Sequence, residues 1–204
     1  MNINQPTIRY KRVFCSDLHH AHNRIVELTN RGVVTTQENH TEWMIDTWNT
    51  NVPKGTEVWH LGDFSFSTKY EEIKNIVRQL NGNKYFIKGN HCDAKILDKL
   101  KQEGFISNWF DYKEIKIGNT KTVLFHFPIA SWNGQHRGSW HLHGHSHGNY
   151  FIPKGKILDV GIDSAYNILG QHRFFTEDDI ADYMSKRDVH TVDHHIVKDN
   201  DEKY

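Results

Sequence analysis

The sequence predicts a layered α/β fold, and three features of the chain support this prediction. In the first half, a short apolar segment, a polar turn and an amphipathic helix follow one another repeatedly. The second half opens with the pattern of a β-hairpin and continues with further strands. A helix with a capping signal follows these strands. Alternation of strands and helices is typical of a β-sheet covered by helices.

The first half of the chain supplies the strand–turn–helix units. Apolar runs of strand length predict buried strands at residues 9–15, 57–61 and 84–88. Apolar residues at helical spacing predict helices at residues 25–28, from 36 onward, at 68–80 and around 96–100. Gly82 and Gly104 stand where two of these helices would end. Polar residues follow each strand, at the edge where open α/β sheets form their binding sites.

The second half is richer in strands. Two runs of strand-forming residues flank Gly118, which predicts a β-hairpin over residues 112–117 and 121–125. Further strands are expected at 139–143 and 156–160, followed by a helix that begins at the capping sequence of Thr176. Because no repeat or linker interrupts the chain, we expect a single domain over residues 1–187. Residues 188–204 are expected to form a polar C-terminal tail.

Composition argues against several classes of protein. The chain has Lys+Arg 25 and Asp+Glu 25, a formal net charge of +0, whereas coating nucleic acid or an anionic membrane needs a basic excess. Two cysteines are too few for a disulfide framework or a thiolate zinc site. No apolar run approaches a membrane span and the first residues are polar, so we expect a soluble, cytoplasmic protein.

The 16 histidines are the outlier in this composition, and they are densest at residues 141–148. Imidazole is the commonest neutral metal ligand, and Gly144 and Gly148 allow the backbone to bend around an ion. A surface histidine tract, or a histidine-rich protein that stores metal, would show the same local pattern. This segment alone leaves these alternatives open.

Other potential ligands stand at the ends of predicted strands, and together with the histidine segment they form one set: Asp17, His19, Asp63, Asn90, His91, His126, His145 and His147. Nitrogen and oxygen ligands without a thiolate suit Mn²⁺, Fe, Zn²⁺ or Ni²⁺. With His91 set aside, the set is too large for one ion and sufficient for two if one carboxylate bridges. Two divalent ions would outweigh the charges of Asp17 and Asp63, so the pocket would attract a phosphate anion.

The order of these motifs resembles that of the calcineurin-like metallophosphoesterases, and in particular of their small stand-alone bacterial and phage members. The motifs are Asp17-x-His19, Gly62-Asp63, Gly89-Asn90-His91, His126 and Gly144-His145-Ser146-His147. The resemblance implies a four-layer αββα sandwich of two mixed β-sheets flanked by helices. It implies two metal sites with Asp63 between them, one formed by Asp17, His19 and His147, the other by Asn90, His126 and His145.

The resemblance also implies that His91 and Asp63 are catalytic. His91 would face the leaving group and assist its departure. Two positions depart from the pattern of many family members. Cys92 separates the Asn-His pair from the acidic residue Asp93, and Phe66 stands where an acidic residue commonly orients the catalytic histidine. The sequence therefore leaves the partner of His91 open.

Several residues near these motifs are weaker candidates for substrate binding. Asn90 is expected to contact the substrate as well as a metal ion. His22 and Asn23 follow the first ligand pair and could contact the substrate phosphate, although a solvent-exposed helix start explains them equally well. A polar and aromatic loop at residues 132–137 could contact a leaving group, but an ordinary surface loop is the favoured interpretation.

The remaining histidines and acidic residues are interpreted as structural. His60 lies within a predicted strand and fits a core position. His141 and His143 fit the core or the surroundings of the ligands better than direct coordination. Asp159 and Asp163 are interpreted as part of a structural turn and not as a third metal site.

We therefore expect a dinuclear metal-dependent phosphoesterase that acts by in-line attack of a metal-bridging hydroxide. Mn²⁺ is the expected metal. A small phosphodiester is the expected substrate, because a site without a capping domain would be open and His91 could assist an alkoxide leaving group. A phosphomonoesterase or a nucleotide phosphohydrolase is the alternative enzyme, and a non-catalytic scaffold with the same fold is the alternative outside enzymes. Stable nucleic-acid binding is not expected, since no basic groove is visible.

Overall fold

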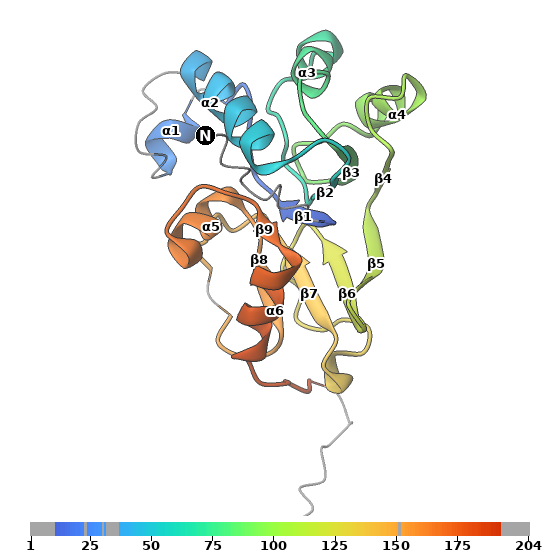
Figure 1. The fold of residues 1–204 in the computed structure, drawn as a ribbon, viewed down its shortest axis with the longest axis vertical. Helices are drawn as coiled ribbons and strands as arrows, with labels where there is room; N and C mark the ends of the chain where they lie inside the picture. The colour runs from blue at the N-terminus through green and yellow to red at the C-terminus, as the bar shows by residue number, and fades with distance from the viewer. Residues whose placement is uncertain (1–10, 23, 30, 32–36, 151, 193–204) are drawn as a thin grey trace, which may run out of the picture.

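The computed structural model describes residues 11–22, 24–29, 31, 37–150 and 152–192, which form two β-sheets with helices around them (Figure 1). The predicted α/β fold with two mixed sheets flanked by helices is therefore confirmed. None of the helices within these ranges is long and apolar enough to cross a membrane. The predicted boundary of the C-terminal tail stays a prediction, and residues 193–204 lie outside the described ranges.

The first sheet has five strands in the order β4-β3-β2-β1-β9. Its parallel strands are β1 (Arg12–Cys15), β2 (Glu57–His60), β3 (Asn83–Ile87) and β4 (Asn108–Phe110), and β9 (Phe175–Thr176) pairs with β1 in the antiparallel direction. The predicted apolar runs correspond to β1, β2 and β3. β4 and β9 were not predicted, because 3 and 2 residues are too few to show a periodic pattern.

The second sheet has four strands in the order β5-β6-β7-β8. β5 (Tyr112–Ile117) and β6 (Thr120–Phe125) pair in the antiparallel direction and are the predicted hairpin. β7 (Trp140–His143) runs parallel to β6 and to β8 (Ile157–Asp159). Every strand of this sheet was predicted. β7 and β8 are shorter than the expected strands at residues 139–143 and 156–160.

The first sheet is covered on its outer face by helices from the first half of the chain. These are α2 (Gln37–Asn51), α3 (Tyr70–Val77) and α4 (Ala94–Gln102), grouped at the top of the view in Figure 1. Val13, Val58 and Phe86 of the sheet pack there with Trp48 of α2 and Leu100 of α4. The short helix α1 (Ile25–Leu28) buries Ile25. The predicted helix start at Thr36 lies outside the described residues.

The core between the two sheets is built from the alternate strand residues, because successive side chains of a strand point to opposite faces. It contains Phe14 and Trp59 from the first sheet and Leu124, Leu142 and Leu158 from the second. Two helices close this core at one side, α5 (Ile162–Leu169), on the left of Figure 1, and α6 (Glu177–Ser185), below it. The predicted capping box at Thr176 opens α6.

The outer face of the second sheet is covered by the segment that follows β6. Trp132 packs there against Val123 of β6 and Ile157 of β8. A single turn of 3-10 helix, Gln135–Arg137, continues this segment. The loop expected at residues 132–137 is thus anchored to the sheet by a buried tryptophan.

Candidate metal centre

The predicted ligands lie on loops that follow the carboxyl ends of β1, β2, β3, β6 and β7. Backbone hydrogen bonds join these loops directly. The N–H groups of Asp17 and His19 donate to the carbonyl oxygens of Gly62 and Asp63 at 3.0 Å each. Parallel strands bring their carboxyl ends to the same edge of a sheet. Side chains that are distant in the sequence therefore meet at this edge.

Five of the ligand positions share an unusual backbone conformation. Their φ angles are positive although none is a glycine: Asp17 (58°), His19 (52°), Asp63 (56°), His145 (70°) and His147 (49°). Such a conformation costs on the order of 1–3 kcal/mol at each residue and persists only where the surrounding structure holds it. The concentration of these residues at one edge of the sheets makes this edge the candidate functional site.

The first group of candidate ligands is Asp17, His19 and His147. Their ligand atoms lie within 4.8 Å of one another. Nε2 of His19 is 3.8 Å from Asp17 Oδ1, and Nε2 of His147 is 4.0 Å from the same oxygen. The carboxylate is fully buried and the His147 ring is partly exposed, so the group is open on one side.

The second group is Asp63, His126 and His145, whose ligand atoms also lie within 4.8 Å of one another. Nε2 of His126 is 3.4 Å from Asp63 Oδ2. Asn90 joins this group, since its Oδ1 lies 2.9 Å from His126 Nε2 and 3.0 Å from His145 Nδ1. Asp63 faces the first group as well, with Oδ2 at 3.8 Å from Nε2 of His19.

A divalent metal ion fits the donor atoms of the first group. Asp17 Oδ1 and both ring nitrogens of His19 are buried and have no hydrogen-bond partner within the described part of the chain. Buried polar atoms without a partner are energetically costly, and a buried charge is tolerated when it is paired or coordinates a metal. Nitrogen and carboxylate donors at these separations can surround one cation.

The electrostatic environment keeps Asp63 ionised and favours a positive charge at His126. Burial alone would raise the pKa of Asp63, but hydrogen bonding from His126 and from the backbone N–H of His91 outweighs burial and lowers this pKa. Burial likewise opposes the charged form of His126, but the Asp63 and Asp17 carboxylates prevail and raise the pKa of His126. A bound cation would take the place of the proton on this imidazole.

A buried ion pair behind the first group was missed by the sequence analysis. Nδ1 of His147 lies 2.8 Å from Asp163 Oδ2, and Asp163 pairs with the fully buried Arg31. The prediction that Asp163 belongs only to a structural turn was therefore incomplete, because Asp163 lies in the first turn of α5 and contacts a candidate ligand. Arg31 and Asp163 are separated by 132 residues, so no local pattern connects them.

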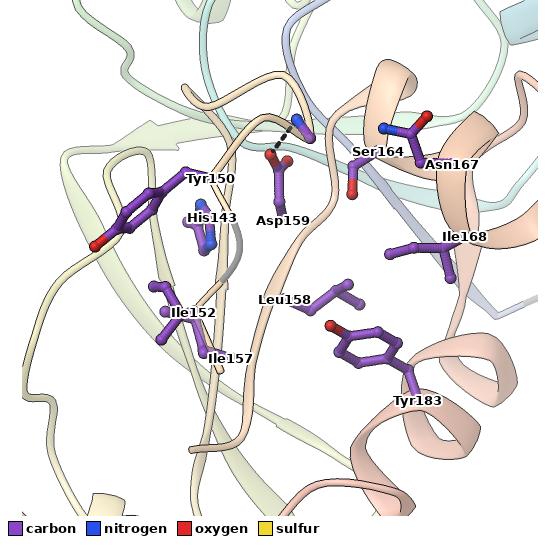
Figure 2. Close-up of a pocket in the computed structure, with 11 residues that line it drawn as sticks. His143, Tyr150, Ile152, Ile157, Leu158, Asp159, Ser164, Asn167, Ile168 and Tyr183 are labelled. Atoms are coloured by element: carbon purple, nitrogen blue, oxygen red, sulfur yellow. Dashed lines mark hydrogen bonds between the residues drawn. The ribbon is translucent and has the colours of Figure 1, made fainter. Parts of the chain in front are cut away.

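The other acidic residue of that segment, Asp159, stabilises the turn that carries His145 and His147. Its Oδ2 accepts hydrogen bonds from Ser146 Oγ at 2.7 Å and from the Gly148 N–H at 2.9 Å. This agrees with the structural role predicted for Asp159. Figure 2 shows Asp159 on the wall of a cavity of about 250 Å³, and no predicted metal ligand lines this cavity.

The predicted catalytic histidine lies beside the second group. His91 Nε2 is 4.0 Å from Asp63 Oδ2, and the His91 side chain is 40% exposed. The His91 backbone N–H donates to Asp63 Oδ1 at 3.0 Å. The ring packs against Phe66 with a centroid distance of 4.3 Å. Phe66, at the position where a hydrogen-bonding partner of His91 was expected, thus makes an apolar contact with the ring instead.

Of the two predicted phosphate contacts, His22 lies close to the site and Asn23 falls outside the described residues. The His22 ring is 5.6 Å from the His19 ring and 4.2 Å from the Phe66 ring, measured between centroids. Its Nδ1 accepts a hydrogen bond from the Arg24 backbone N–H at 3.2 Å. His22 therefore borders the candidate centre and remains a candidate for substrate contact.

The histidines interpreted as structural are buried. His60, the last residue of β2, is fully buried on the side of the sheet that faces α2, where it packs against Phe64 and Phe86. His143 Nδ1 donates to the carbonyl oxygen of Gly144 at 2.8 Å, inside the segment that leads to His145. His141 is buried in the second sheet. None of these three rings belongs to either candidate ligand group.

Comparison with known protein families shows which family has this arrangement of motifs. A model of the family described as calcineurin-like phosphoesterase matches residues 10–202. The chain belongs to this family. Membership implies metal-dependent hydrolysis of a phosphate ester, and the two Asp/His clusters could hold the divalent metal ions. The resemblance predicted from the motifs is confirmed.

Relatives of this phosphoesterase occur in an archaeon and in phages. An uncharacterised protein of Methanocaldococcus jannaschii is 30% identical over 155 residues, which cover 72% of this chain and 79% of that protein. The Gene 66 protein of Mycobacterium phage L5 is 23% identical over 207 residues, which cover 87% of this chain and 98% of the phage protein.

A solved structure shares the fold of this phosphoesterase. It is a protein of unknown function from Aquifex aeolicus, with a TM-score of 0.61 and 19% sequence identity, and the match covers 84% of this chain and 98% of the other. At this identity the similarity shows the fold alone.

Proposed function

We propose that this phosphoesterase is a dinuclear metal-dependent phosphodiesterase. One divalent ion is held by Asp17, His19 and His147, and the other by Asn90, His126 and His145, with Asp63 between the two. The observation that carries the proposal is the convergence of these side chains at one sheet edge, where Asp17 Oδ1 and the His19 nitrogens are buried and lack partners among the described residues.

In this proposal the metal ions, Asp63 and His91 have different roles in the reaction. A bound pair of divalent ions would supply charge that polarises a phosphate ester and lowers the pKa of a water molecule. The Asp63 carboxylate could be a ligand of both ions, because its Oδ2 lies near a histidine of each group, 3.8 Å from His19 Nε2 and 3.4 Å from His126 Nε2. His91 would donate a proton to the departing oxygen, a contribution of roughly 10²–10⁴-fold for a well-placed acid.

We favour a diester substrate because the site is open to solvent and because the arginine behind it is not available to bind a dianion. Asn90, His91 and His145 are all exposed, which leaves room for the two substituents of a diester. A monoester dianion carries more negative charge and gains more from a neighbouring cationic side chain. Arg31, the arginine behind the centre, is 1% exposed and donates to Asp163 and to backbone carbonyl groups. Arg31 is thus not available to bind a phosphate dianion.

The proposal is tested by removing metal with a chelator, restoring Mn²⁺, and comparing bis-p-nitrophenyl phosphate with p-nitrophenyl phosphate. We expect faster hydrolysis of the diester. Asp63→Asn should lose both bound metal and turnover, whereas His91→Ala should keep the metal and lose roughly 10²–10⁴-fold in kcat. Asp182→Asn, which alters an exposed carboxylate on α6, is the matched control and should behave as the parent.

Each alternative predicts a different result. A phosphomonoesterase or nucleotide phosphohydrolase would prefer the monoester or a nucleotide. A non-catalytic scaffold would show no turnover with Mn²⁺, Fe²⁺, Zn²⁺ or Ni²⁺. A histidine-rich storage protein would keep its metal in Asp63→Asn, and full activity of that variant would reject the bridging role of Asp63. Loss of metal in His91→Ala would make His91 a ligand.

A further inference from the structure

Arg31 is a buried cation whose hydrogen bonds converge on the first group of candidate ligands. Its side chain is fully buried. Nε donates to Asp163 Oδ1 at 2.9 Å and Nη2 donates to Asp163 Oδ2 at 2.8 Å, which makes a bidentate ion pair. Paired fork geometry of this kind is the strongest form of the arginine–carboxylate interaction. Arg31 and Asp163 therefore form a rigid unit next to the centre.

The remaining N–H groups of Arg31 hold the loop that follows β1. Nη2 donates to the carbonyl oxygen of Asp17 at 2.7 Å, and Nη1 donates to that of Leu18 at 2.8 Å. Nη1 also lies 2.8 Å from Nε2 of His40 on α2. The positive φ of Asp17 (58°) needs support from its surroundings, and these bonds supply it. All five N–H groups of the guanidinium thus have partners.

Asp163 connects this unit to a ligand. Its Oδ2 lies 2.8 Å from Nδ1 of His147, on the opposite side of the ring from Nε2, which lies 4.0 Å from Asp17 Oδ1. A carboxylate acceptor at Nδ1 selects the tautomer with the proton on Nδ1. Nε2 then carries the lone pair that a metal ion needs.

Among the described residues, no arginine–carboxylate pair is hydrogen-bonded to the histidines of the second group. His126 Nδ1 lies 2.8 Å from the backbone carbonyl oxygen of Leu61, and His145 Nδ1 lies 3.0 Å from Asn90 Oδ1. These are neutral partners, and neither His126 nor His145 is hydrogen-bonded to Arg31 or Asp163. A change in the ion pair should therefore affect the first group selectively.

We propose that Arg31 and Asp163 are positioning residues for the metal ion held by Asp17, His19 and His147. Asp163 orients His147 and fixes its tautomer, and Arg31 holds both Asp163 and the backbone of Asp17 in place. The inference rests on the proposed dinuclear centre, and it adds residues that set the metal affinity of one of its two sites without touching the ion.

The test is a Mn²⁺ titration of chelator-stripped protein by calorimetry, together with the Mn²⁺ electron paramagnetic resonance spectrum at saturating and at limiting metal. The parent should bind two equivalents and show a spin-coupled pair. Asp163→Asn keeps the size of the side chain, but its NH₂ group cannot accept a hydrogen bond. Either the bond from Arg31 Nε to Oδ1 or the bonds from Arg31 Nη2 and His147 Nδ1 to Oδ2 must therefore be lost. We expect one equivalent to bind as in the parent and the other roughly 10–100-fold more weakly. The spectrum of an isolated Mn²⁺ ion should appear at limiting metal.

Asp179→Asn is the matched control, because Asp179 forms a bidentate pair with Arg173 at 2.7 Å for each bond and contacts no candidate ligand. This variant loses a comparable ion pair, so its melting temperature without metal should fall, while both equivalents of Mn²⁺ bind as in the parent. A purely structural role of Asp163 predicts the same pattern for Asp163→Asn, and that result would overturn the proposal.

Arg31→Lys provides a second variant if Asp163→Asn does not fold. A lysine can keep a charge beside Asp163 but has three donors and no planar fork. It cannot hold Asp163 and both backbone carbonyl oxygens in the same geometry. We expect weaker binding at the same single site, and unchanged binding of both equivalents would contradict the inference. A parent protein that binds fewer than two equivalents would instead reject the dinuclear centre itself.

Discussion

Phe66 packs against two histidines at the candidate centre, and this contact explains how His91 is held without an acidic partner. The Phe66 ring centroid is 4.3 Å from that of His91 and 4.2 Å from that of His22. Phe66 itself is 40% exposed, so its ring lies at the surface beside the two histidines. This ring contact restricts the rotamers of the exposed His91 side chain.

Shortening the Phe66 side chain should therefore weaken catalysis without releasing metal. We expect Phe66→Ala to lower kcat about 10-fold, because His91 would visit several rotamers and point at the leaving group for a smaller fraction of the time. Steady-state kinetics and Mn²⁺ stoichiometry measured on the same sample test this expectation. Phe66→Tyr should retain most of the activity, and Tyr112→Ala, at another exposed aromatic residue, serves as the control. An unchanged kcat in Phe66→Ala would show that the contact is incidental.

At the residue scale, the sequence predicted side chains that belong to local motifs and missed those that meet only in the fold. Asp17, Asp63 and His145 follow strands in recognisable patterns, and the structure brings them together. Arg31 and Asp163 could not be paired in advance, because their contact depends on how the segment after α1 meets α5.

At the candidate metal centre, glycines allow the loops after the strands to pack very closely against one another. A Cβ on Gly89 would overlap Asp63 Oδ1 and lie 2.5 Å from the Asp63 backbone nitrogen. A Cβ on Gly144 would overlap Ser16 Oγ and lie 2.5 Å from Asp17 Oδ2. The loops after β3 and β7 therefore pack directly on the carboxylates carried by the loops after β2 and β1.

Gly89→Ala should for this reason remove metal binding. The added methyl group must displace the Asp63 carboxylate or the whole loop, since the atoms it meets belong to backbone and to a buried side chain. We expect Mn²⁺ affinity to fall at least 10-fold by calorimetry. Gly104→Ala is the control, because Gly104 has a φ of +77° but no atom within 4 Å of the place that a methyl group would take, so it should cost only stability, about 1 kcal/mol. Normal metal binding by Gly89→Ala would contradict the proposed position of Asp63.

At the element scale, long periodic segments were predicted better than short ones. The β5–β6 hairpin and α6 have clear turn and capping signals, and the structure contains both. Helix α5 (Ile162–Leu169) was not predicted, because Gly161 and Asp163 were interpreted as parts of a turn. Its contribution of Asp163 to the surroundings of His147 was missed for the same reason.

Across the whole molecule, buried histidines occur in several layers. His40 lies on α2, His60 on β2 and His141 on β7, and each is fully buried. Burial is the main cause that lowers the pKa of each of these three histidines to about 3. They are neutral in the native protein over the physiological range, and the unfolded chain has histidines that protonate near pH 6.5.

The metal-free protein should therefore lose stability as the pH falls below about 6.5. Between pH 6.5 and 3 the unfolded chain binds protons at these positions that the native chain does not bind, so the free energy of unfolding decreases with decreasing pH. The raised pKa values of His126 and His147 act in the opposite sense, but only above pH 6.5. The lowered pKa of Asp63 begins to matter only near pH 4.

These three histidines alone should reduce the free energy of unfolding by on the order of 5 kcal/mol between pH 6.5 and pH 5, and other histidines with lowered pKa values, such as the buried His20, add to this decrease. Urea denaturation in the presence of chelator measures this difference directly. His141→Gln should reduce the difference between the two pH values by on the order of 1.5 kcal/mol, the share of one histidine whose pKa is lowered to about 3. Equal stability at the two pH values would mean that the native protein protonates these rings without unfolding.

At the scale of the whole molecule, alternation along the strands predicted which residues are buried, but not how the two sheets face each other. The packing of Phe14 and Trp59 against Leu124, Leu142 and Leu158 follows from tertiary contacts between distant strands. The two-sheet arrangement was expected from the resemblance of the motifs to a known family and not from periodicity. The fold then explains why motifs spread along the chain form one site.

The central claim is that one edge of the two sheets holds a pair of divalent ions bridged by Asp63. Anomalous difference maps from crystals of the Mn²⁺-loaded protein, recorded near the manganese absorption edge, test it most directly. We predict two peaks roughly 3.5–4 Å apart, one beside Asp17, His19 and His147 and one beside Asn90, His126 and His145, with Asp63 touching both. A single peak, or peaks at histidines elsewhere on the chain, would contradict the account.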